Sequence, residues 1–264
     1  MIGGNKRTLV DVGAHRGSFL KPFASSGWNV IAFEPERTNI RILRNKYRDY
    51  PDVYLIEQAV YHTSGLEIPF YTSKKHFGIH SLKPFHETHE LSYNVNTTRL
   101  DDTLNKLNID KVDLIKIDIE GADFIALKSF DFRKFNPEIV MTEFMDNRSV
   151  SNFGYSHHDI VKYMEKFDYT TYVSEWEPIR EYGVEGSKSQ HKWIQCIPYP
   201  TDHEPAWGNL IFINNKCKEK FETILTNYLD KIIPEYPISR WNKILMKNLP
   251  GFIINRLKEI KNIK

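Results

Sequence analysis

Residues 8–17, TLVDVGAHRG, join a strand-length apolar run to a turn that contains Gly13 and Gly17. A second apolar run, VIAFEP, follows and carries Glu34 at its end. In dinucleotide-binding folds a glycine-rich turn and the next helix hold a pyrophosphate, and an acidic residue about 20 positions further on binds the ribose hydroxyls. The pattern therefore predicts a strand, turn, helix and strand unit, with Glu34 in the position of the ribose ligand.

The carboxylate of Asp11 distinguishes this turn from a phosphate site. Asp11 lies at the end of the first apolar run, where its charge would repel a pyrophosphate but attract an ammonium or a sulfonium group. S-adenosylmethionine combines a ribose and an adenine with both cationic groups, so these residues favour it as the cofactor. Two plainer interpretations stay open. The glycines can merely permit a tight turn, and Glu34 can be an ordinary exposed strand end before Pro35.

Apolar runs of strand length alternate with helical patterns from Arg7 to Phe167. Such alternation predicts βαβ units in a mostly parallel sheet with helices on both faces, which is a Rossmann-like α/β fold. Ligands of these folds bind at the carboxyl ends of the strands. Since four of the runs carry an acid where they end, we expect these acids, Asp11, Glu34, Asp118 and Glu143, to meet at one edge of the sheet.

The organisation of the chain follows from where this alternation changes. We expect a cofactor-binding domain over 1–215, with an insertion at about 63–100 that contains a β-hairpin and a histidine-bearing loop. An aromatic-rich elaboration at about 150–208 would lie on the acceptor side. Residues 216–264 hold 11 Lys or Arg against 5 Asp or Glu, with apolar residues at helical spacing. This tail predicts a basic amphipathic helix that either docks on its own domain or makes peripheral contact with an anionic membrane.

Charge and cysteine content argue against several classes of protein. Lys and Arg number 36 against 34 Asp and Glu, and the resulting net charge of +2 gives no basic footprint for a nucleic acid partner. Cys196 and Cys217 lack the spacing of a zinc site or of a disulfide framework. No apolar stretch reaches the length of a membrane span or of a signal sequence. We therefore expect a cytoplasmic protein, and its oligomeric state stays open.

Six motifs in a fixed order give the chain a family resemblance. They are DVGAHRG, FEPERTNIRILRN, QAVYHTSG, TTRLDDTL, VDLIKIDIEGADFIALKSF and PEIVMTEF, and with the first strand they cover about residues 9–144. In this order they resemble the FkbM-type methyltransferases, a branch of the class I S-adenosylmethionine-dependent enzymes. The resemblance implies a seven-stranded sheet whose last strand is antiparallel, and O-methylation of an alcohol, frequently on a sugar or a natural product. The chain departs from the family at His15, where asparagine is common.

The resemblance also implies which residues hold the cofactor. Gln58 and Ala59, after the third strand, would lie beside the adenine. Together with the residues of the two apolar runs and the fourth strand, the expected cofactor contacts are Asp11, Gly13, Ala14, His15, Gly17, Glu34, Pro35, Gln58, Ala59 and Asp118.

Asp118 and Glu120, in KIDIEGAD, are the acidic pair that we most expect to take part in the reaction. Alternate residues of a strand share a face, so the two carboxylates would project together unless the strand has already ended. Close carboxylates favour a proton, a cationic group or a metal ion between them. The plainer interpretation is that Glu120 caps the next helix, whose N-terminus favours an acid.

Methyl transfer to a hydroxyl needs a group that takes the hydroxyl proton, and a positioned base contributes roughly 10²–10⁴-fold. The candidates are His80, Asp118, Glu120 and Glu143. His80 has the most suitable ordinary pKa, although a loop histidine is commonly just solvated. Alternatively, Asp118 and Glu143 hold a magnesium or manganese ion that acidifies the hydroxyl, since both ions prefer oxygen ligands.

The segment from Phe153 to Trp207 mixes tyrosines and tryptophans with polar side chains, a composition that suits a sugar. We expect a carbohydrate hydroxyl as the acceptor, with a natural-product alcohol as the alternative. At least half of these aromatic side chains are expected to fill a core. A nicotinamide-dependent oxidoreductase is disfavoured by Asp11 and by the GxxxG spacing, and a non-catalytic scaffold of the same fold stays open.

Overall fold

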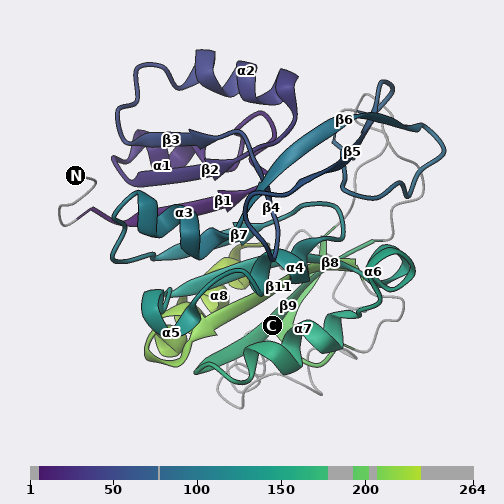
Figure 1. Ribbon diagram of the computed structural model, residues 1–264. Helices are drawn as coiled ribbons and strands as arrows, with labels where there is room; N and C mark the ends of the chain where they lie inside the picture. Colours follow the sequence, from purple (N-terminus) through teal and green to yellow (C-terminus); the bar gives the residue numbers. More distant parts are fainter. Residues whose placement is uncertain (1–5, 77, 178–192, 202–206, 233–264) are drawn as a thin grey trace, which may run out of the picture.

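The computed structural model describes residues 6–76, 78–177, 193–201 and 207–232 (Figure 1). Its centre is an eight-stranded sheet in the order β10, β9, β11, β8, β7, β1, β2, β3. These strands are β1 (Thr8–Val12), β2 (Asn29–Phe33), β3 (Val53–Ile56), β7 (Leu114–Ile117), β8 (Ile139–Met145), β9 (Tyr169–Trp176), β10 (Trp193–Pro198) and β11 (Trp207–Asn214). The predicted α/β fold with a large, mostly parallel sheet is confirmed.

The sheet has two parts that differ in strand direction. From β8 through β7 and β1 to β2 and β3 all neighbours are parallel. Beyond β8, strand β11 is antiparallel to both β8 and β9, and β10 is antiparallel to β9. The sheet therefore has one strand more than the seven expected, because β9, β10 and β11 form an antiparallel extension on one side.

Successive side chains of the strands enter two different cores, which places helices on both faces. Leu9 packs with α1 (Lys21–Ser25) and α2 (Arg37–Lys46), whereas Val10 packs on the opposite face. That opposite face is covered by α3 (Leu100–Lys106), α4 (Asp123–Leu127), α5 (Phe132–Phe135) and α7 (His157–Met164). Helix α6 (Asp146–Phe153) follows β8 directly, near the edge where the strands end (Figure 1).

A separate three-stranded sheet in the order β4, β6, β5 projects from the large one (Figure 1). It consists of β4 (Ala59–Val60), β5 (Glu67–Ser73) and β6 (His89–Thr98), and it packs Phe70 and Val95 in a small core of its own. The loop after β5 reaches α6, where Lys83 Nζ donates to the Asn152 carbonyl oxygen over 2.8 Å. The small sheet and its loop therefore border the carboxyl ends of the parallel strands.

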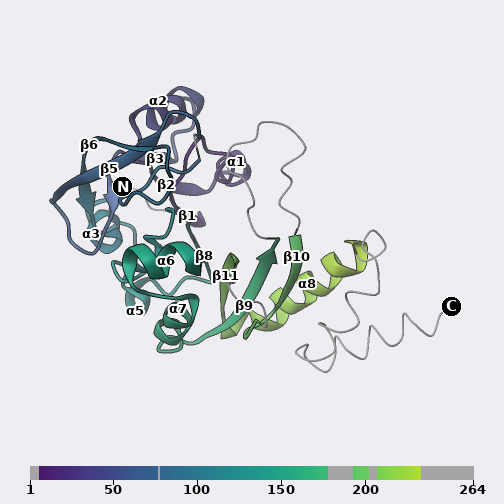
Figure 2. The ribbon, with the colours of Figure 1, turned by 90° about the vertical axis from the view of Figure 1, so that its right-hand side faces the viewer.

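Helix α8 (Lys218–Ile232) follows the short 3₁₀ helix η1 (Asn215–Cys217) and lies along β9, β10 and β11 (Figure 2). Its Leu225 and Leu229 pack against Tyr172 of β9 and Ile213 of β11. The rest of the predicted basic tail, residues 233–264, lies outside the described residues. Within the described part of the chain, no helix combines the length and the apolar character needed to cross a membrane.

Candidate active site

Gly13 lets the turn after β1 approach the turn after β7. Its φ is +79°, and a Cβ atom at this position would lie 2.0 Å from the carbonyl oxygen of Asp118. A larger residue would therefore push the two turns apart. The N–H groups of Gly13 and Ala14 both donate over 3.0 Å to the carbonyl oxygen of Phe33, at the end of β2. The glycine thus allows the carboxyl ends of three neighbouring strands to close around one space.

Glu34 is buried just beyond β2, and each of its carboxylate oxygens accepts one backbone hydrogen bond. Oε2 accepts from the N–H of His15 over 2.7 Å, and Oε1 accepts from the N–H of Glu36 over 2.8 Å. Each oxygen keeps a further lone pair. Burial raises the pKa of the Glu34 carboxyl to about 7, although the two amides oppose this. With 5% of its surface exposed, Glu34 is not the exposed strand end of the plainer interpretation.

A pocket opens between these turns and the small sheet. Seven of the ten predicted cofactor contacts line it, namely Gly13, His15, Glu34, Pro35, Gln58, Ala59 and Asp118. The apolar part of the pocket wall includes Phe33, Val60, Phe70 and Leu82. Besides Asp118, two more candidate bases line the pocket, His80 and Glu120. The pocket therefore offers apolar surface together with carboxylates, a combination that suits a nucleoside with a cationic end.

Asp11 does not line this pocket, in contrast to its predicted contact with the cofactor. Along β1 it shares the face of Leu9, so its carboxylate points toward the α1 side and not off the end of the strand. It is fully buried there, 3.5 Å from Nζ of Lys116 on β7. Lys116 also donates to the Gly13 carbonyl oxygen over 3.0 Å and lies 3.4 Å from Asp118 Oδ2. Asp11 is thus the counter-charge of a buried lysine behind the turn.

Ala14 and Gly17, two further predicted cofactor contacts, also lie outside the pocket wall. Ala14 is buried in the core beneath α1 and α2. A Cβ atom on Gly17, where φ is +73°, would lie 2.7 Å from the side chains of Leu43 and Tyr47. The Tyr47 hydroxyl donates to the Gly17 carbonyl oxygen over 2.7 Å. For Gly17 the plainer interpretation holds, because the residue lets α2 pack closely against the turn.

The three acids of the fourth and fifth strands meet through a turn. β7 ends at Ile117, before Asp118, so the strand has already ended and the carboxylates of Asp118 and Glu120 do not share a strand face. Instead, Glu120 adopts a φ of +60° and Gly121 a φ of +95°. The resulting turn brings carboxylate oxygens of Asp118, Glu120 and Glu143 within 4.8 Å of one another. We call these three residues the acidic rim.

Glu120 does not cap the next helix. The N-cap residue of α4 is Ala122, and no side chain among the described residues caps this helix. The carboxylate of Asp123, the first residue of α4, accepts the N–H groups of Ile119 over 3.3 Å and of Gly121 over 3.0 Å and so fixes the turn before the helix. Burial raises the pKa of the Asp123 carboxyl to about 7. Glu120 is therefore left to face the pocket, and its left-handed backbone is a strained conformation for a residue with a side chain.

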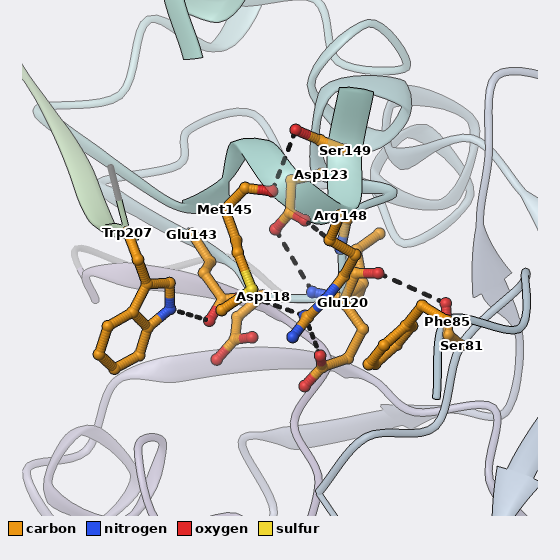
Figure 3. Close-up of polar contacts among 12 residues, drawn as sticks. Ser81, Phe85, Asp118, Glu120, Asp123, Glu143, Met145, Arg148, Ser149 and Trp207 are labelled. Carbon is orange, nitrogen blue, oxygen red and sulfur yellow. Dashed lines mark hydrogen bonds and ion pairs between the residues drawn. The ribbon is translucent and has the colours of Figure 1, made fainter. Parts of the chain in front are cut away.

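Arg148, which the sequence analysis does not single out, contacts two members of the acidic rim (Figure 3). Its Nη1 forms an ion pair with Glu120 and lies 3.5 Å from Oε2 of Glu143. Trp207 of β11 donates its indole N–H to Oε1 of Glu143 over 3.3 Å. Burial and the neighbouring carboxylates raise the pKa of the Glu143 carboxyl, which Arg148 opposes. The rim is thus an acidic cluster with a cation built into it.

The family model described as the methyltransferase FkbM domain matches residues 11–171, which is more than half of the chain. The chain belongs to the FkbM methyltransferase family. It is therefore a methyltransferase of the S-adenosylmethionine-dependent type. No curated protein matches it.

Solved structures with similarity to this FkbM methyltransferase include three at a TM-score of 0.39. A precorrin-6y C5,15-methyltransferase from Geobacter metallireducens has 10% identity, over 80% of this chain and 82% of that one. An rRNA methylase from Streptococcus thermophilus has 9% identity, over 81% and 89%. A putative methyltransferase from Streptococcus mutans, in complex with SAH, has 10% identity, over 79% and 88%. At these values the likeness says nothing about the acceptor.

In the FkbM methyltransferase described here, His80 lines the pocket but is poorly arranged to act as a base. The N–H of Ser73 donates to its Nδ1 over 3.3 Å. The neutral ring then carries its own proton on Nε2, so the lone pair that a base needs is already engaged. Burial lowers the pKa of His80, which favours this neutral form. Among the four candidate bases, the geometry favours the three carboxylates.

Proposed function

We propose that this FkbM methyltransferase transfers a methyl group from S-adenosylmethionine to a hydroxyl group of a carbohydrate. The observation that carries the proposal is the position of Asp118, which lines the pocket and also belongs to the acidic rim. A proton acceptor and the site for the cofactor therefore share one wall. Such an arrangement suits an acceptor whose proton leaves as the methyl group arrives.

The pocket offers a partner for the ribose, the adenine and the sulfonium of the cofactor. Glu34 would accept hydrogen bonds from the ribose diol with the lone pairs that the two backbone amides leave free. Ala59, Val60 and Phe70 offer apolar surface for the adenine. When bound, S-adenosylmethionine supplies an electrophilic methyl group on a sulfonium, whose positive charge a carboxylate such as Asp118 would stabilise.

Asp118 is the first candidate for the base. Its side chain is 42% exposed, whereas those of Glu120 and Glu143 are 15% and 17% exposed. Asp118 would take the hydroxyl proton as the new oxygen–carbon bond forms, while the sulfur–carbon bond breaks and the sulfonium becomes a neutral thioether. Because the acceptor oxygen must approach in line with the breaking bond, its positioning supplies much of the rate.

Trp176 and Trp207 support a carbohydrate acceptor. Their ring centroids lie 6.2 Å apart, and Trp207 is hydrogen-bonded to the rim through Glu143. Flat aromatic rings beside carboxylates suit a sugar, whose C–H faces pack on rings while its hydroxyls donate to oxygens. Other aromatic side chains of the predicted acceptor segment pack in the cores, among them Tyr155, Tyr169, Tyr172 and Trp193. Tyr182 of that segment lies outside the described residues.

A magnesium or manganese ion on Asp118 and Glu143 is the alternative to a protein base. The oxygen spacing within the acidic rim is compatible with a shared ion. However, Arg148 already contacts two of the three rim acids, and Lys116 pairs with the third. The charges around the rim therefore favour a carboxylate base.

Labelled S-adenosylmethionine tests the acceptor. The enzyme is incubated with a panel of oligosaccharides, small alcohols, lipids, peptides and nucleic acids, and Asp118→Asn serves as the blank. Label in the oligosaccharides supports the proposal, and label entering only another class overturns the choice of acceptor. Nucleic acids are expected to stay unlabelled, because the net charge of +2 provides no basic groove. Sedimentation with anionic vesicles tests the membrane contact proposed for the basic tail.

A further inference from the structure

We infer that Arg148 occupies the cation position of the acidic rim, so that methyl transfer by this enzyme needs no divalent metal ion. The consequence for the reaction rests on the proposed role of the rim as the base. The position of Arg148 stands on its contacts alone. Arg148 lies on α6, after the last motif of the family resemblance.

The guanidinium of Arg148 contacts carboxylate oxygens of the acidic rim, which are the oxygens that a shared metal ion would bind. Its Nη1 touches Oε2 of Glu120 and lies 3.5 Å from Oε2 of Glu143. The Arg148 side chain is 4% exposed, so water screens its charge weakly. Because a guanidinium does not lose its proton in proteins, the positive charge is permanent.

Two neighbours hold the Arg148 side chain in this place, and Figure 3 labels the first of them, Phe85. The Phe85 ring, from the loop after β5, has its centroid 4.1 Å from Cζ of Arg148. On the other side, a Cβ atom added at Gly121 would lie 3.1 Å from Cδ of Arg148, which is tighter than an ordinary contact. The glycine in the turn after β7 thus leaves the room that the arginine fills. The cation is built into the fold by three separate segments.

The third rim acid has a fixed cation of its own. Lys116 Nζ lies 3.4 Å from Oδ2 of Asp118 and 3.5 Å from Oδ1 of Asp11. Every member of the acidic rim is therefore within 4.0 Å of a lysine or an arginine. A divalent ion on the same carboxylates would be repelled by both of these charges, and it would have to break the contact between Arg148 and Glu120.

Arg148 is accordingly a positioning residue, which acts through the two glutamates. Two carboxylates held side by side repel each other, and one of them takes up a proton unless a positive charge lies between them. Arg148 supplies that charge without a soluble ion. The arrangement keeps Glu120 and Glu143 beside Asp118, in the orientation that the reaction requires.

Titration with manganese tests the inference directly. Binding of Mn²⁺ is followed by electron paramagnetic resonance, with neither cofactor nor acceptor present, on the wild type, Arg148→Met and Arg148→Lys. Removal of the guanidinium should leave Glu120 and Glu143 without their cation, so Arg148→Met should bind Mn²⁺ at least roughly tenfold more tightly than the wild type. Arg148→Lys, the matched control, keeps the charge and should bind as weakly as the wild type.

A chelator provides the second arm on the wild type, with whichever acceptor the labelling panel identifies. Methyl transfer should be unchanged by the chelator and by added Mg²⁺ or Mn²⁺. Three results would each overturn the inference. They are tight Mn²⁺ binding by the wild type, wild-type activity that a chelator removes and Mn²⁺ restores, and a folded Arg148→Met that gains no Mn²⁺ binding. The two wild-type measurements decide the matter even if Arg148→Met does not fold. A wrong choice of acceptor class would leave the Mn²⁺ titration untouched.

Discussion

The backbone N–H of His15 donates to Oε2 of Glu34 over 2.7 Å, which ties the turn after β1 to the end of β2. His15 adopts a left-handed backbone with φ of +49°. Asparagine and histidine are both among the residues that tolerate this conformation best. Since the contact uses the backbone, the departure from the asparagine common in the family leaves the hydrogen bond to Glu34 intact.

Glu34→Ala should weaken binding of S-adenosylhomocysteine without unfolding the protein. Loss of hydrogen bonds to a charged group costs about 1.5–3 kcal/mol, or roughly 10- to 150-fold in Kd. Titration calorimetry measures the change. The control is Glu36→Ala, which removes the side chain that caps α2 by accepting the Asn39 N–H over 2.7 Å but lies outside the pocket wall. It should lower the melting temperature and leave Kd unchanged, and unaltered Kd in Glu34→Ala would refute the ribose role.

Affinity for S-adenosylhomocysteine should rise with pH around neutrality. Burial raises the pKa of Glu34 to about 7, so the empty pocket holds a proton on this carboxyl below that pH. The diol needs the ionised form as its acceptor, and binding below pH 7 must therefore release the proton. Kd should be about tenfold larger at pH 6 than at pH 8. Glu34→Gln, which cannot titrate, should flatten this dependence; an equally steep profile in that variant would assign it to another group.

Gly13→Ala should destabilise the fold more than Gly27→Ala. Both glycines have a positive φ, +79° and +74°, which costs about 1–2 kcal/mol for alanine. Only at Gly13 would the new Cβ atom meet another group, the Asp118 carbonyl oxygen at 2.0 Å, whereas nothing lies within 4 Å at Gly27. Denaturant unfolding of both variants separates the two costs. Equal losses would show that the close approach of the two turns contributes nothing.

Asp118→Asn should lower kcat by roughly 10²–10⁴-fold, the usual contribution of a positioned base. The melting temperature should change little, because the side chain is 42% exposed and keeps its shape. Asp110→Asn, at an exposed aspartate, is the control. His80→Ala should cost much less activity than Asp118→Asn, because Nδ1 of His80 already accepts a hydrogen bond. Full activity in Asp118→Asn would rule out this aspartate as the base.

The sequence predicts those parts of the molecule that depend on one strand and the turn after it. Alternation of apolar runs with helical patterns indicates the parallel sheet. The position of Glu34 at the end of a run places it at the carboxyl edge, where the structure has it in the pocket wall. Asp118, at the end of another run, lines the same wall. Glu120 also lines it, but through a turn whose left-handed backbone gives no signal in a pattern of apolar residues.

Pairing across strands is what the sequence does not reveal. Asp11 and Lys116 are neighbours in the ladder between β1 and β7, although more than a hundred residues separate them along the chain. A period of two along β1 puts Asp11 on the side of Leu9, which would have indicated its buried position. Arg148 gives no such hint, because its contacts with Glu120 and Phe85 depend on how α6 and the loop after β5 meet in space.

The order of the strands has a consequence for how such an enzyme can change over evolutionary time. β1, β2 and β3 lie within residues 8–56, and β8 to β11 lie within residues 139–214, so each side of the sheet comes from one continuous stretch of the sequence. The family match ends at residue 171, inside β9. Recombination beyond β8 can therefore replace most of the antiparallel extension in a single event. Asp118, encoded between the two stretches, keeps its place whichever extension is inherited.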